Sequence, residues 1–300
     1  MSSAKRMHLF EYDTQNEECY DIPKWKFSDY NGNVSKVITR DPYYTFVVDR
    51  VNSLVYARYR MMHTGGIHVL RSSTLEIIRS IPMAKIGVYS ESLAISKEGR
   101  LYVGMNNLVT VYDAETLREV MKINLLNNTS WVSNGGSAIA ISDTDQVVVS
   151  LYQHDYVFEK DMPLHVFESS GAVKEFSCGI KDRRLLSLQF NSQGNLLVID
   201  PVNELISLTN SKFELLDTLE MKNSVGRYWN KMCMDKFDRL LYVNEYGCGL
   251  CCYSCDFRLI DQLSVKDFEI NHPVGTDVDN DGQIFLLGYG GRNWCILRPP

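Results

Sequence analysis

The chain has 300 residues, of which 45% are hydrophobic and 23% are charged, and its formal net charge is -6. This composition is that of a globular protein and excludes a disordered chain, while the acidic balance excludes a chain-wide basic field for nucleic acid. The sequence has no signal-peptide pattern and no apolar run long enough to cross a membrane, so we expect a cytoplasmic protein with reduced cysteines and no membrane partner.

Residues 7–22 are the first strand-like segment and resemble the end of a repeating unit, because "MHLFEYDTQNEECYDI" is similar to "VTVYDAETLREVMKI" at 109–123. Further along, a short apolar strand, a polar turn and a second apolar strand recur six times. The copies are "VVDRVNSLVYA" from Val47, "AISKEGRLYVG" from Ala94, "AISDTDQVVVS" from Ala140, "QFNSQGNLLVI" from Gln189, "CMDKFDRLLYV" from Cys233 and "DVDNDGQIFLL" from Asp277.

The turns of these copies have similar residue types at two positions. Their first residues are Asp49, Ser96, Ser142, Asn191, Asp235 and Asp279, at intervals of 47, 46, 49, 44 and 44. Three positions later the chain has a residue type that tolerates a left-handed backbone at low cost, namely Asn52, Gly99, Asp145, Gly194, Asp238 and Gly282. Each copy is therefore predicted to be a β-hairpin whose first turn side chain bonds to the backbone NH groups of the turn.

Two more strand-like segments follow the hairpins, such as "LVTVYD" and "REVMKI" after the second, which gives four strands per unit. Four strands repeated every 44 to 49 residues are typical of a β-propeller. We predict an all-β, six-bladed propeller of four-stranded antiparallel blades, forming a single domain over 1–300. The last unit is one strand short, so residues 7–22 are expected to close its blade. The blades are expected at 43–82, 91–124, 136–177, 184–220, 230–264 and 274–297.

One segment of the fourth unit carries a family resemblance. In "VIDPVNELISL", the V-x-D-x-x-N-x-x-I pattern of Val198, Asp200, Asn203 and Ile206 resembles the core of NHL repeats, which form the six-bladed propellers of TRIM-NHL proteins. The pattern is complete in one unit of six, because the position of Asp200 is elsewhere occupied by Arg58, Met105, Leu151, Asn244 and Gly288. The resemblance implies a platform that binds proteins or RNA on one face without catalysis.

The stretch "YGCGLCCYSC" at 246–255 holds Cys248, Cys251, Cys252 and Cys255 in the paired C-x-x-C pattern of zinc sites. When the six units are aligned, this stretch leads into the third strand of the fifth unit. Cys251 and Cys255 would then lie about 13 Å apart at about 3.3 Å per residue, too far to share one tetrahedral ion. We therefore expect thiols packed between blades rather than a metal site.

Two other sets of residues resemble metal-binding patterns. "DVDNDGQI" at 277–284 is similar to a calcium loop through Asp277, Asp279 and Asp281, but Gly288 stands where the twelfth-position glutamate is needed. Some six-bladed propellers, the lactonases among them, hold a central calcium ion, which requires several converging oxygen ligands. The sequence offers such ligands on two adjacent blades, as Asp200, Asn203, Asn244 and Glu245. We predict no catalytic site, metal or cofactor, with a calcium-dependent lactonase-type hydrolase as the enzymatic alternative.

The predicted function is that of a non-enzymatic, monomeric interaction module. Linkers into the first strand of each blade and loops between its second and third strands emerge on the same side, here called the linker face. Arginines and large aromatics, which are enriched in interface hot spots, gather in these segments. The predicted partner-binding residues are Arg58, Arg60, Tyr89, Trp131, Arg184, Arg227, Tyr228, Trp229, Arg292 and Trp294.

The expected ligand of this face is a protein or peptide, and single-stranded RNA is the alternative because arginines and aromatics also stack on bases. Single aromatic residues have a second interpretation. Trp229 and Trp294 are alternatively residues that fill the gaps between blades.

Overall fold

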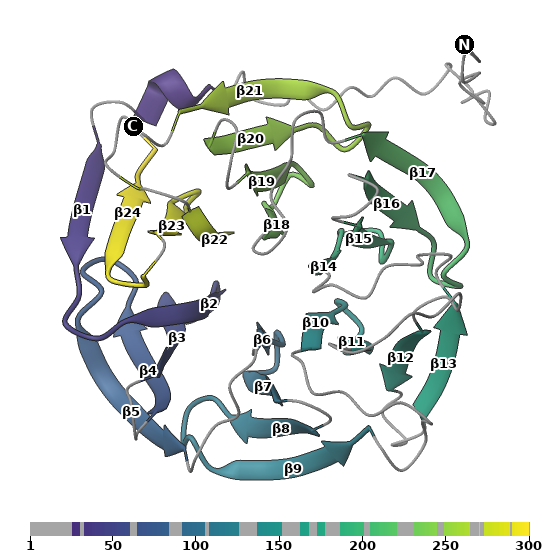
Figure 1. Ribbon diagram of the computed structural model, residues 1–300, viewed down its shortest axis with the longest axis horizontal. Coiled ribbons are helices and arrows are strands. Elements are labelled where there is room, and N and C mark those ends of the chain that lie inside the picture. Colours follow the sequence, from purple (N-terminus) through teal and green to yellow (C-terminus); the bar gives the residue numbers. More distant parts are fainter. Residues whose placement is uncertain are drawn as a thin grey trace.

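The computed structural model is a ring of six four-stranded antiparallel sheets around a central axis (Figure 1). It describes residues 26–30, 33–60, 65–83, 92–105, 108–125, 137–151, 163–167, 173–177, 187–200, 205–220, 231–244, 249–264, 270, 273–288 and 290–299. The prediction of an all-β, six-bladed propeller is confirmed. The helical content of the described residues is the 3-10 turn η1 (Phe27–Tyr30), and none of their helices is long and apolar enough to cross a membrane.

Blades are numbered here in chain order, and the strands of each are given from the axis outward. Blade 1 contains β2 (Tyr43–Asp49), β3 (Leu54–Arg60), β4 (Gly65–Arg71) and β5 (Ile77–Met83), and blade 2 contains β6 (Ser92–Ile95), β7 (Arg100–Met105), β8 (Leu108–Asp113) and β9 (Glu119–Asn124). Blade 3 contains β10 (Ser137–Ile141), β11 (Val147–Leu151), β12 (Pro163–Phe167) and β13 (Val173–Ser177), and blade 4 contains β14 (Leu188–Phe190), β15 (Leu196–Asp200), β16 (Leu205–Thr209) and β17 (Leu215–Glu220). Blade 5 contains β18 (Met232–Met234), β19 (Leu240–Asn244), β20 (Gly249–Tyr253) and β21 (Leu259–Leu263), and blade 6 contains β22 (Pro273–Val278), β23 (Ile284–Gly288), β24 (Asn293–Leu297) and β1 (Val34–Ile38).

The outer strand of blade 6 comes from the beginning of the chain. This strand is β1, which pairs antiparallel with β24 so that Val34 lies opposite Leu297 and Ile38 lies opposite Asn293. Residues 7–22, the expected closing segment, lie outside the described residues, and the position is taken by residues further along the chain. "VSKVI" of β1 has no strict apolar and polar alternation, so its pattern did not reveal a strand.

The turns between the first and second strands follow the predicted chemistry at five of six sites. A positive φ is found at Gly99, Asp145, Gly194, Asp238 and Gly282. In blade 1 the left-handed residue is Ser53 instead of Asn52. The reason is that Asp49 pairs with Leu54, whereas in blade 2 the NH of Ser96 bonds to the carbonyl of Arg100, so the first turn is one residue longer. These turns define the hairpin face, opposite the linker face.

The turns between the third and fourth strands contain a feature that the sequence reading missed. In four blades they hold a bulky apolar residue with a positive φ, a conformation that costs such residues about 1–2 kcal/mol. These residues are Leu75 (58°), Leu117 (58°), Phe213 (65°) and Phe257 (59°). Their side chains pack into clusters between blades, and this burial offsets the strain.

A β-bulge follows each of these four turns. The register of the outer strand shifts at one residue in blades 1, 2, 4 and 5, which leaves Ile78, Val120, Leu216 and Ile260 without a partner in the ladder. Bulges twist an exposed sheet edge away from pairing with another chain. The bulged outer strands therefore protect the free edges of the four blades.

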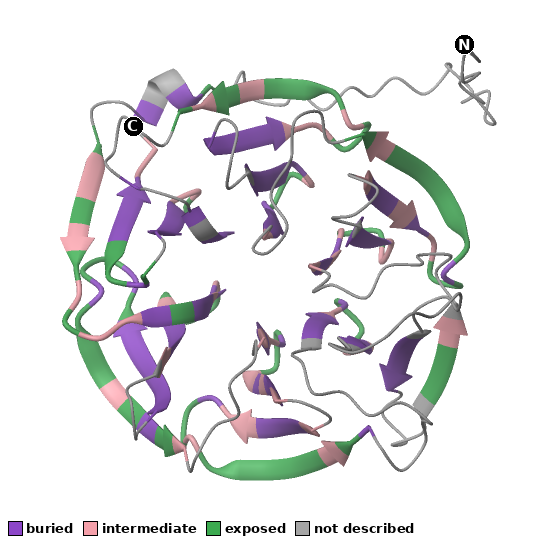
Figure 2. Cartoon of the chain, in the orientation of Figure 1, coloured by how far each residue is buried: buried purple, intermediate pink, exposed green. Residues whose placement is uncertain are grey.

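Side chains of neighbouring blades meet in buried clusters, and Figure 2 shows that burial decreases from the inner strands to the outer ones. The cluster between blades 5 and 6 includes Cys233, Cys252 and Cys295. Cys255 is exposed in the turn after β20, and Cys248 lies outside the described residues. In the part of the chain that the structure describes, no group of three His, Cys, Asp or Glu residues could hold a metal ion. The buried cysteines pack as small apolar groups.

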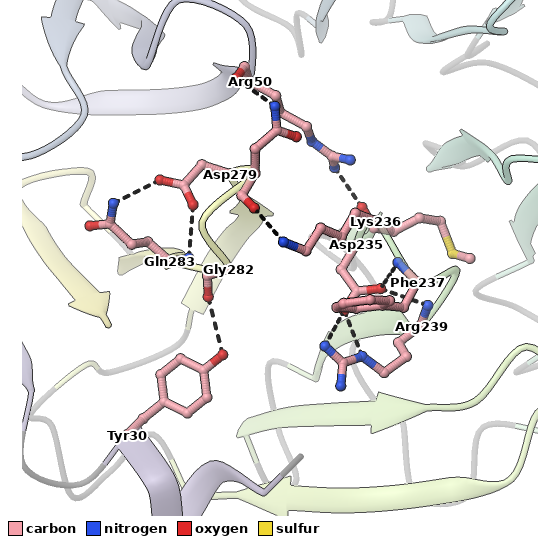
Figure 3. Close-up of polar contacts among 11 residues, drawn as sticks. Tyr30, Arg50, Asp235, Lys236, Phe237, Arg239, Asp279, Gly282 and Gln283 are labelled. Atoms are coloured by element: carbon pink, nitrogen blue, oxygen red, sulfur yellow. Dashed lines mark hydrogen bonds and ion pairs between the residues drawn. The ribbon is translucent and has the colours of Figure 1, made fainter. Parts of the chain in front are cut away.

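Polar contacts on the hairpin face tie blades 5, 6 and 1 together (Figure 3). Lys236 Nζ donates to the carbonyl oxygen of Asn280 at 3.0 Å, and Asn280 Nδ2 donates to the carbonyl oxygen of Arg50 at 2.9 Å. The Arg50 guanidinium in turn donates to the carbonyl oxygen of Met234. Three blades are thus joined at the point where the last blade meets the first.

Candidate functional site

Three of the ten predicted partner-binding residues have described side chains. Arg292 is exposed on the loop before β24, whereas Arg58 and Trp294 are each only 1% exposed. The structure describes the backbone of Arg60 but not its side chain. Six of the predicted residues lie outside the described residues, namely Tyr89, Trp131, Arg184, Arg227, Tyr228 and Trp229. The binding surface as a whole therefore stays a prediction.

Trp294 and Arg58 both lie between blades. The Trp294 ring packs between Tyr43 and Phe46, with ring centroids 5.7 and 4.8 Å away, which corresponds to the packing alternative for this residue. The Arg58 guanidinium contacts the sulfur atoms of Met83, at 3.0 Å from Nη1, and of Met105 in blade 2. Neither side chain reaches the surface of the linker face.

A lysine that the sequence reading did not single out occupies the linker end of the axis. Lys231 immediately precedes β18, the inner strand of blade 5, and its ammonium group donates to the hydroxyl of Thr45 on β2 in blade 1. Its side chain passes Gly275 on β22, the inner strand of blade 6. A Cβ atom at Gly275 would lie in ordinary van der Waals contact with Lys231 Cδ, at 3.6 Å, and in tight contact with Phe46 Cε1, at 3.0 Å, so the glycine mainly makes room for the Phe46 ring. Lys231, Thr45, Gly275 and the neighbouring Asp277 are called the axial site below.

The ammonium group of Lys231 has no carboxylate partner among the described residues. Asp277 is the acidic residue whose charge acts on the Lys231 amine. Its carboxylate, however, accepts hydrogen bonds at 2.8 Å from the NH groups of Val48 and Val278. It also lies 3.6 Å from the Arg50 guanidinium. Burial lowers the pKa of Lys231 to about 8, and the negative charge of Asp277 opposes this shift. A substantial minority of the amine is therefore neutral near physiological pH.

Two other groups line the same region. Cys233, two residues after Lys231, is a buried thiol whose pKa is raised well above its usual value, mainly by burial, so it is not a thiolate nucleophile. Thr276 is only 4% exposed, and its hydroxyl lies beside the Cys233 thiol, where it opposes the effect of burial on the pKa of that thiol. Among the described side chains at the axial site, the Lys231 amine is the group that can exchange a proton near neutral pH.

A β-bulge separates the axial site from a second polar cluster on β2. Residues two apart on a regular strand share a face, but the register shifts between Tyr43 and Thr45, so Tyr43 packs with Trp294 while Thr45 meets Lys231. The Tyr43 hydroxyl is 2.9 Å from Nδ1 of His68, and the Tyr59 ring stacks on this imidazole at 3.9 Å. Burial lowers the pKa of His68 although Asp41 opposes the shift, so the imidazole is neutral.

The candidate calcium residues serve other purposes in the described structure. Asp279 accepts hydrogen bonds within its own turn from the NH groups of Asp281 and Gln283, at 3.0 and 2.8 Å, and from the Gln283 side chain. Asp277 lies on β22 and bonds to the backbone as described above. This arrangement favours the interpretation as a hairpin turn. Of the lactonase-type residues, Asn203 and Glu245 lie outside the described residues, and only the backbone of Asp200 and Asn244 is described.

No family model and no curated protein matches the chain. Solved structures with the same fold do match it. A luciferin-regenerating enzyme is 10% identical with a TM-score of 0.64, over 88% of this chain and 95% of that one. Regucalcin, a calcium-binding protein from Agrobacterium tumefaciens, is 10% identical with a TM-score of 0.62, over 88% and 93%. A catalytically inactive virginiamycin B lyase from Staphylococcus aureus is 9% identical with a TM-score of 0.61, over 88% and 98%.

These neighbours contradict the prediction that the protein is not an enzyme, since they include a lyase and a luciferin-regenerating enzyme. The prediction rested on missing catalytic motifs, but a propeller can assemble its site from single residues on separate blades, which leaves no local motif to find. The six-bladed architecture is supported by the same neighbours. The narrower resemblance to NHL repeats is not supported by these neighbours.

Proposed function

We propose that the protein is an enzyme that acts on a small organic substrate at the linker end of the axis, with Lys231 as the group that exchanges a proton with it. The observation that carries the proposal is the position of the Lys231 ammonium group, which is held by the neutral hydroxyl of Thr45 and by no described carboxylate. Enzymes commonly adjust a lysine pKa toward 7 to 8 by burial so that the amine can serve as a general base or acid.

Two features of the chain support this proposal. Lys231 as a whole is a partly buried residue rather than a fully buried one, although its amine lies in a buried environment. Burying an amine costs free energy, so a position that served packing alone would favour an apolar residue over lysine. A luciferin-regenerating enzyme and a streptogramin B lyase have the same fold, so a catalytic site near the axis is consistent with the architecture.

The test is a comparison of wild type with Lys231→Met on a mixture of small metabolites, monitored by mass spectrometry. We expect wild type to deplete at least one compound with formation of a product, and Lys231→Met to lose at least about a hundredfold of that rate, as for other acid–base groups. Lys97→Met is the control, because Lys97 pairs with Asp143 at 2.8 Å on the hairpin face. Depletion by Lys231→Met at the wild-type rate would refute the role of this amine.

Binding of a protein or peptide on the linker face is a second proposal. Arg292 favours it, because this exposed side chain lies on a loop that is anchored by hydrogen bonds from the NH and hydroxyl of Thr39 to the carbonyl oxygen of Arg292. A pull-down with wild type and Arg292→Glu tests it. A filter-binding titration with single-stranded RNA at several salt concentrations distinguishes the RNA alternative by its steep salt dependence.

A further inference from the structure

We propose that Lys231 reacts with the carbonyl group of a small aldehyde or ketone to form an imine, an inference that rests on the proposed function of the same site. The partner of this amine differs from those of two surface lysines, Lys97 and Lys122. Lys97 lies 2.8 Å from Asp143 and Lys122 lies 2.9 Å from Glu119, so each of these side chains pairs with a carboxylate. Lys231 meets a hydroxyl instead.

A neutral partner matters because only the neutral amine is a nucleophile. A carboxylate at ion-pair distance favours the charged form of a lysine, whereas a hydroxyl can accept a hydrogen bond from either form. Among the described charged groups, Asp277 on β22 acts on Lys231, and Asp277, Asp235 and Arg50 act on the neighbouring Cys233. Asp277 is also bonded to the NH of Val48 and shared with Arg50, so its charge is partly compensated. Cys233 on β18 is a protonated thiol and adds no charge.

The chemistry needs no oxidant, reductant or second reactant. The ammonium group first loses a proton to solvent, and its nitrogen lone pair then forms a bond to the carbonyl carbon. The C=O π electrons move to oxygen, which takes a proton while the nitrogen loses one, and the product is a carbinolamine. Departure of the hydroxyl group as water, with loss of the remaining N–H proton, gives the imine.

Thr45 is a positioning residue in this scheme. Its hydroxyl lies on β2 at 3% exposure and fixes the nitrogen at the end of a flexible four-carbon chain. Gly275 lies beside the Lys231 side chain, and a Cβ atom there would crowd Phe46 at 3.0 Å rather than the lysine. Thr45 acts through Lys231 and need not touch the substrate.

Reductive trapping tests the inference directly. Wild-type protein is incubated with glyoxylate, and in parallel with acetaldehyde, in the presence of sodium cyanoborohydride at pH 7, and the modified lysines are quantified by peptide mass spectrometry. We expect Lys231 to be labelled about tenfold faster than Lys97 or the exposed Lys212, because its larger neutral fraction outweighs its lower basicity. Labelling of Lys231 no faster than Lys97 by both probes would overturn the proposal.

The Thr45→Val variant tests whether Thr45 positions the amine, because a purely structural role of Thr45 would not change the labelling rate of Lys231 relative to Lys97. The variant should slow the labelling of Lys231 several-fold while leaving the labelling of Lys97 unchanged, and Thr45→Ser should restore the rate because it keeps the hydroxyl. Equal Lys231 rates in Thr45→Val and wild type would remove Thr45 from the scheme. All rates are taken from protein with a cooperative thermal transition, and the wild-type result stands even if the valine variant does not fold.

The pKa of Lys231, measured by competitive acetylation against Lys97, separates the two proposals. A pKa near 8 without any imine would overturn the present inference and leave the proposed acid–base function standing. An ordinary lysine pKa would overturn both. Adduct formation with glyoxylate but not with acetaldehyde would support the inference and restrict the substrate to carbonyl compounds that carry an anionic group.

Discussion

Lys231 and Thr45 lie 186 residues apart in the chain and two blades apart in the ring, yet the ammonium group of one donates a hydrogen bond to the hydroxyl of the other. The contact crosses the inner strand of blade 6 and so depends on closure of the ring between blades 6 and 1. Any change that opens this closure should also disturb the candidate active site.

Replacement of Lys231 by methionine should stabilise the protein. The folded-state pKa of about 8 is below the ordinary 10.5, so the folded protein binds fewer protons than the unfolded chain between these pH values. Stability therefore rises as pH increases from 8 to 10.5, and the penalty is fully present below pH 8. We expect Lys231→Met to gain about 1–3 kcal/mol at pH 7, allowing for partial solvent screening.

Thermal unfolding at pH 7 and pH 10 checks this expectation. The melting temperature of Lys231→Met should exceed that of wild type by a few degrees at pH 7, and the difference should shrink at pH 10. Lys97→Met serves as the control and should change little. A Lys231→Met variant less stable than wild type at pH 7 would mean that the lysine contributes to folding.

His165 should make the protein sensitive to acid. This residue is fully buried on β12, and burial lowers its pKa to about 4 from the usual 6.5, with Glu175 as the facing charge at 3.8 Å from Nδ1. Between these pH values the unfolded chain binds more protons, so stability is present above pH 6.5 and is lost as pH falls toward 4. The loss is about 3 kcal/mol from this residue. Urea unfolding of wild type and His165→Leu should show a flatter pH dependence in the variant, and parallel curves would contradict the assignment.

Two adjacent glycines, Gly290 and Gly291, allow a test of how closely the loop before β24 approaches the backbone of β2. Gly291 has φ of 71°, and a Cβ atom there would lie 1.9 Å from the carbonyl oxygen of Tyr43. Gly290 has φ of 82° with nothing within 4 Å of the added atom. Gly290→Ala should therefore cost about 1 kcal/mol from backbone strain alone. Gly291→Ala should cost at least about 3 kcal/mol, because the backbone of β2 must move. Similar melting temperatures for the two variants would show that β2 shifts easily.

Leu75 should reverse the usual order of alanine and glycine substitutions. Its side chain is 4% exposed and its φ is 58°, so alanine loses the packing but keeps the strain, whereas glycine loses the packing and relieves the strain. We expect Leu75→Gly to be more stable than Leu75→Ala by about 1 kcal/mol, with both below wild type. Chemical denaturation measures the difference, and an alanine variant equal to or better than glycine would indicate that the turn relaxes.

The closing strand can be located by truncation. Deletion of residues 1–22 leaves β1 intact and should change the melting temperature little. Deletion of residues 1–38 removes the outer strand of blade 6 and should lower it sharply, because β24 then becomes an unpaired edge. If both truncations lowered the melting temperature equally and strongly, residues 7–22 would be needed to close the ring.

The propeller was predictable from the sequence because its hairpin turns are encoded locally. The backbone at Gly99, Gly194 and Gly282 must be left-handed, and residues that tolerate this conformation recur at the same step of every turn. Six such turns at near-constant intervals specify six blades without any knowledge of their packing. The left-handed Leu75 was missed because a bulky residue gives no signal for this conformation, and only its burial between blades sustains it.

The candidate site depended on the tertiary structure. No local pattern indicates that Trp294 and Arg58 turn into the gaps between blades, or that Lys231 crosses blade 6 to reach Thr45. Such contacts arise from the placement of whole sheets around the axis, which depends on the sum of many packing interactions between blades. The sequence by itself determined the repeat, its turns and the number of blades, since these follow from the conformational preferences of neighbouring residues. The closing strand and the lysine at the axis were decided by contacts between residues far apart in the chain.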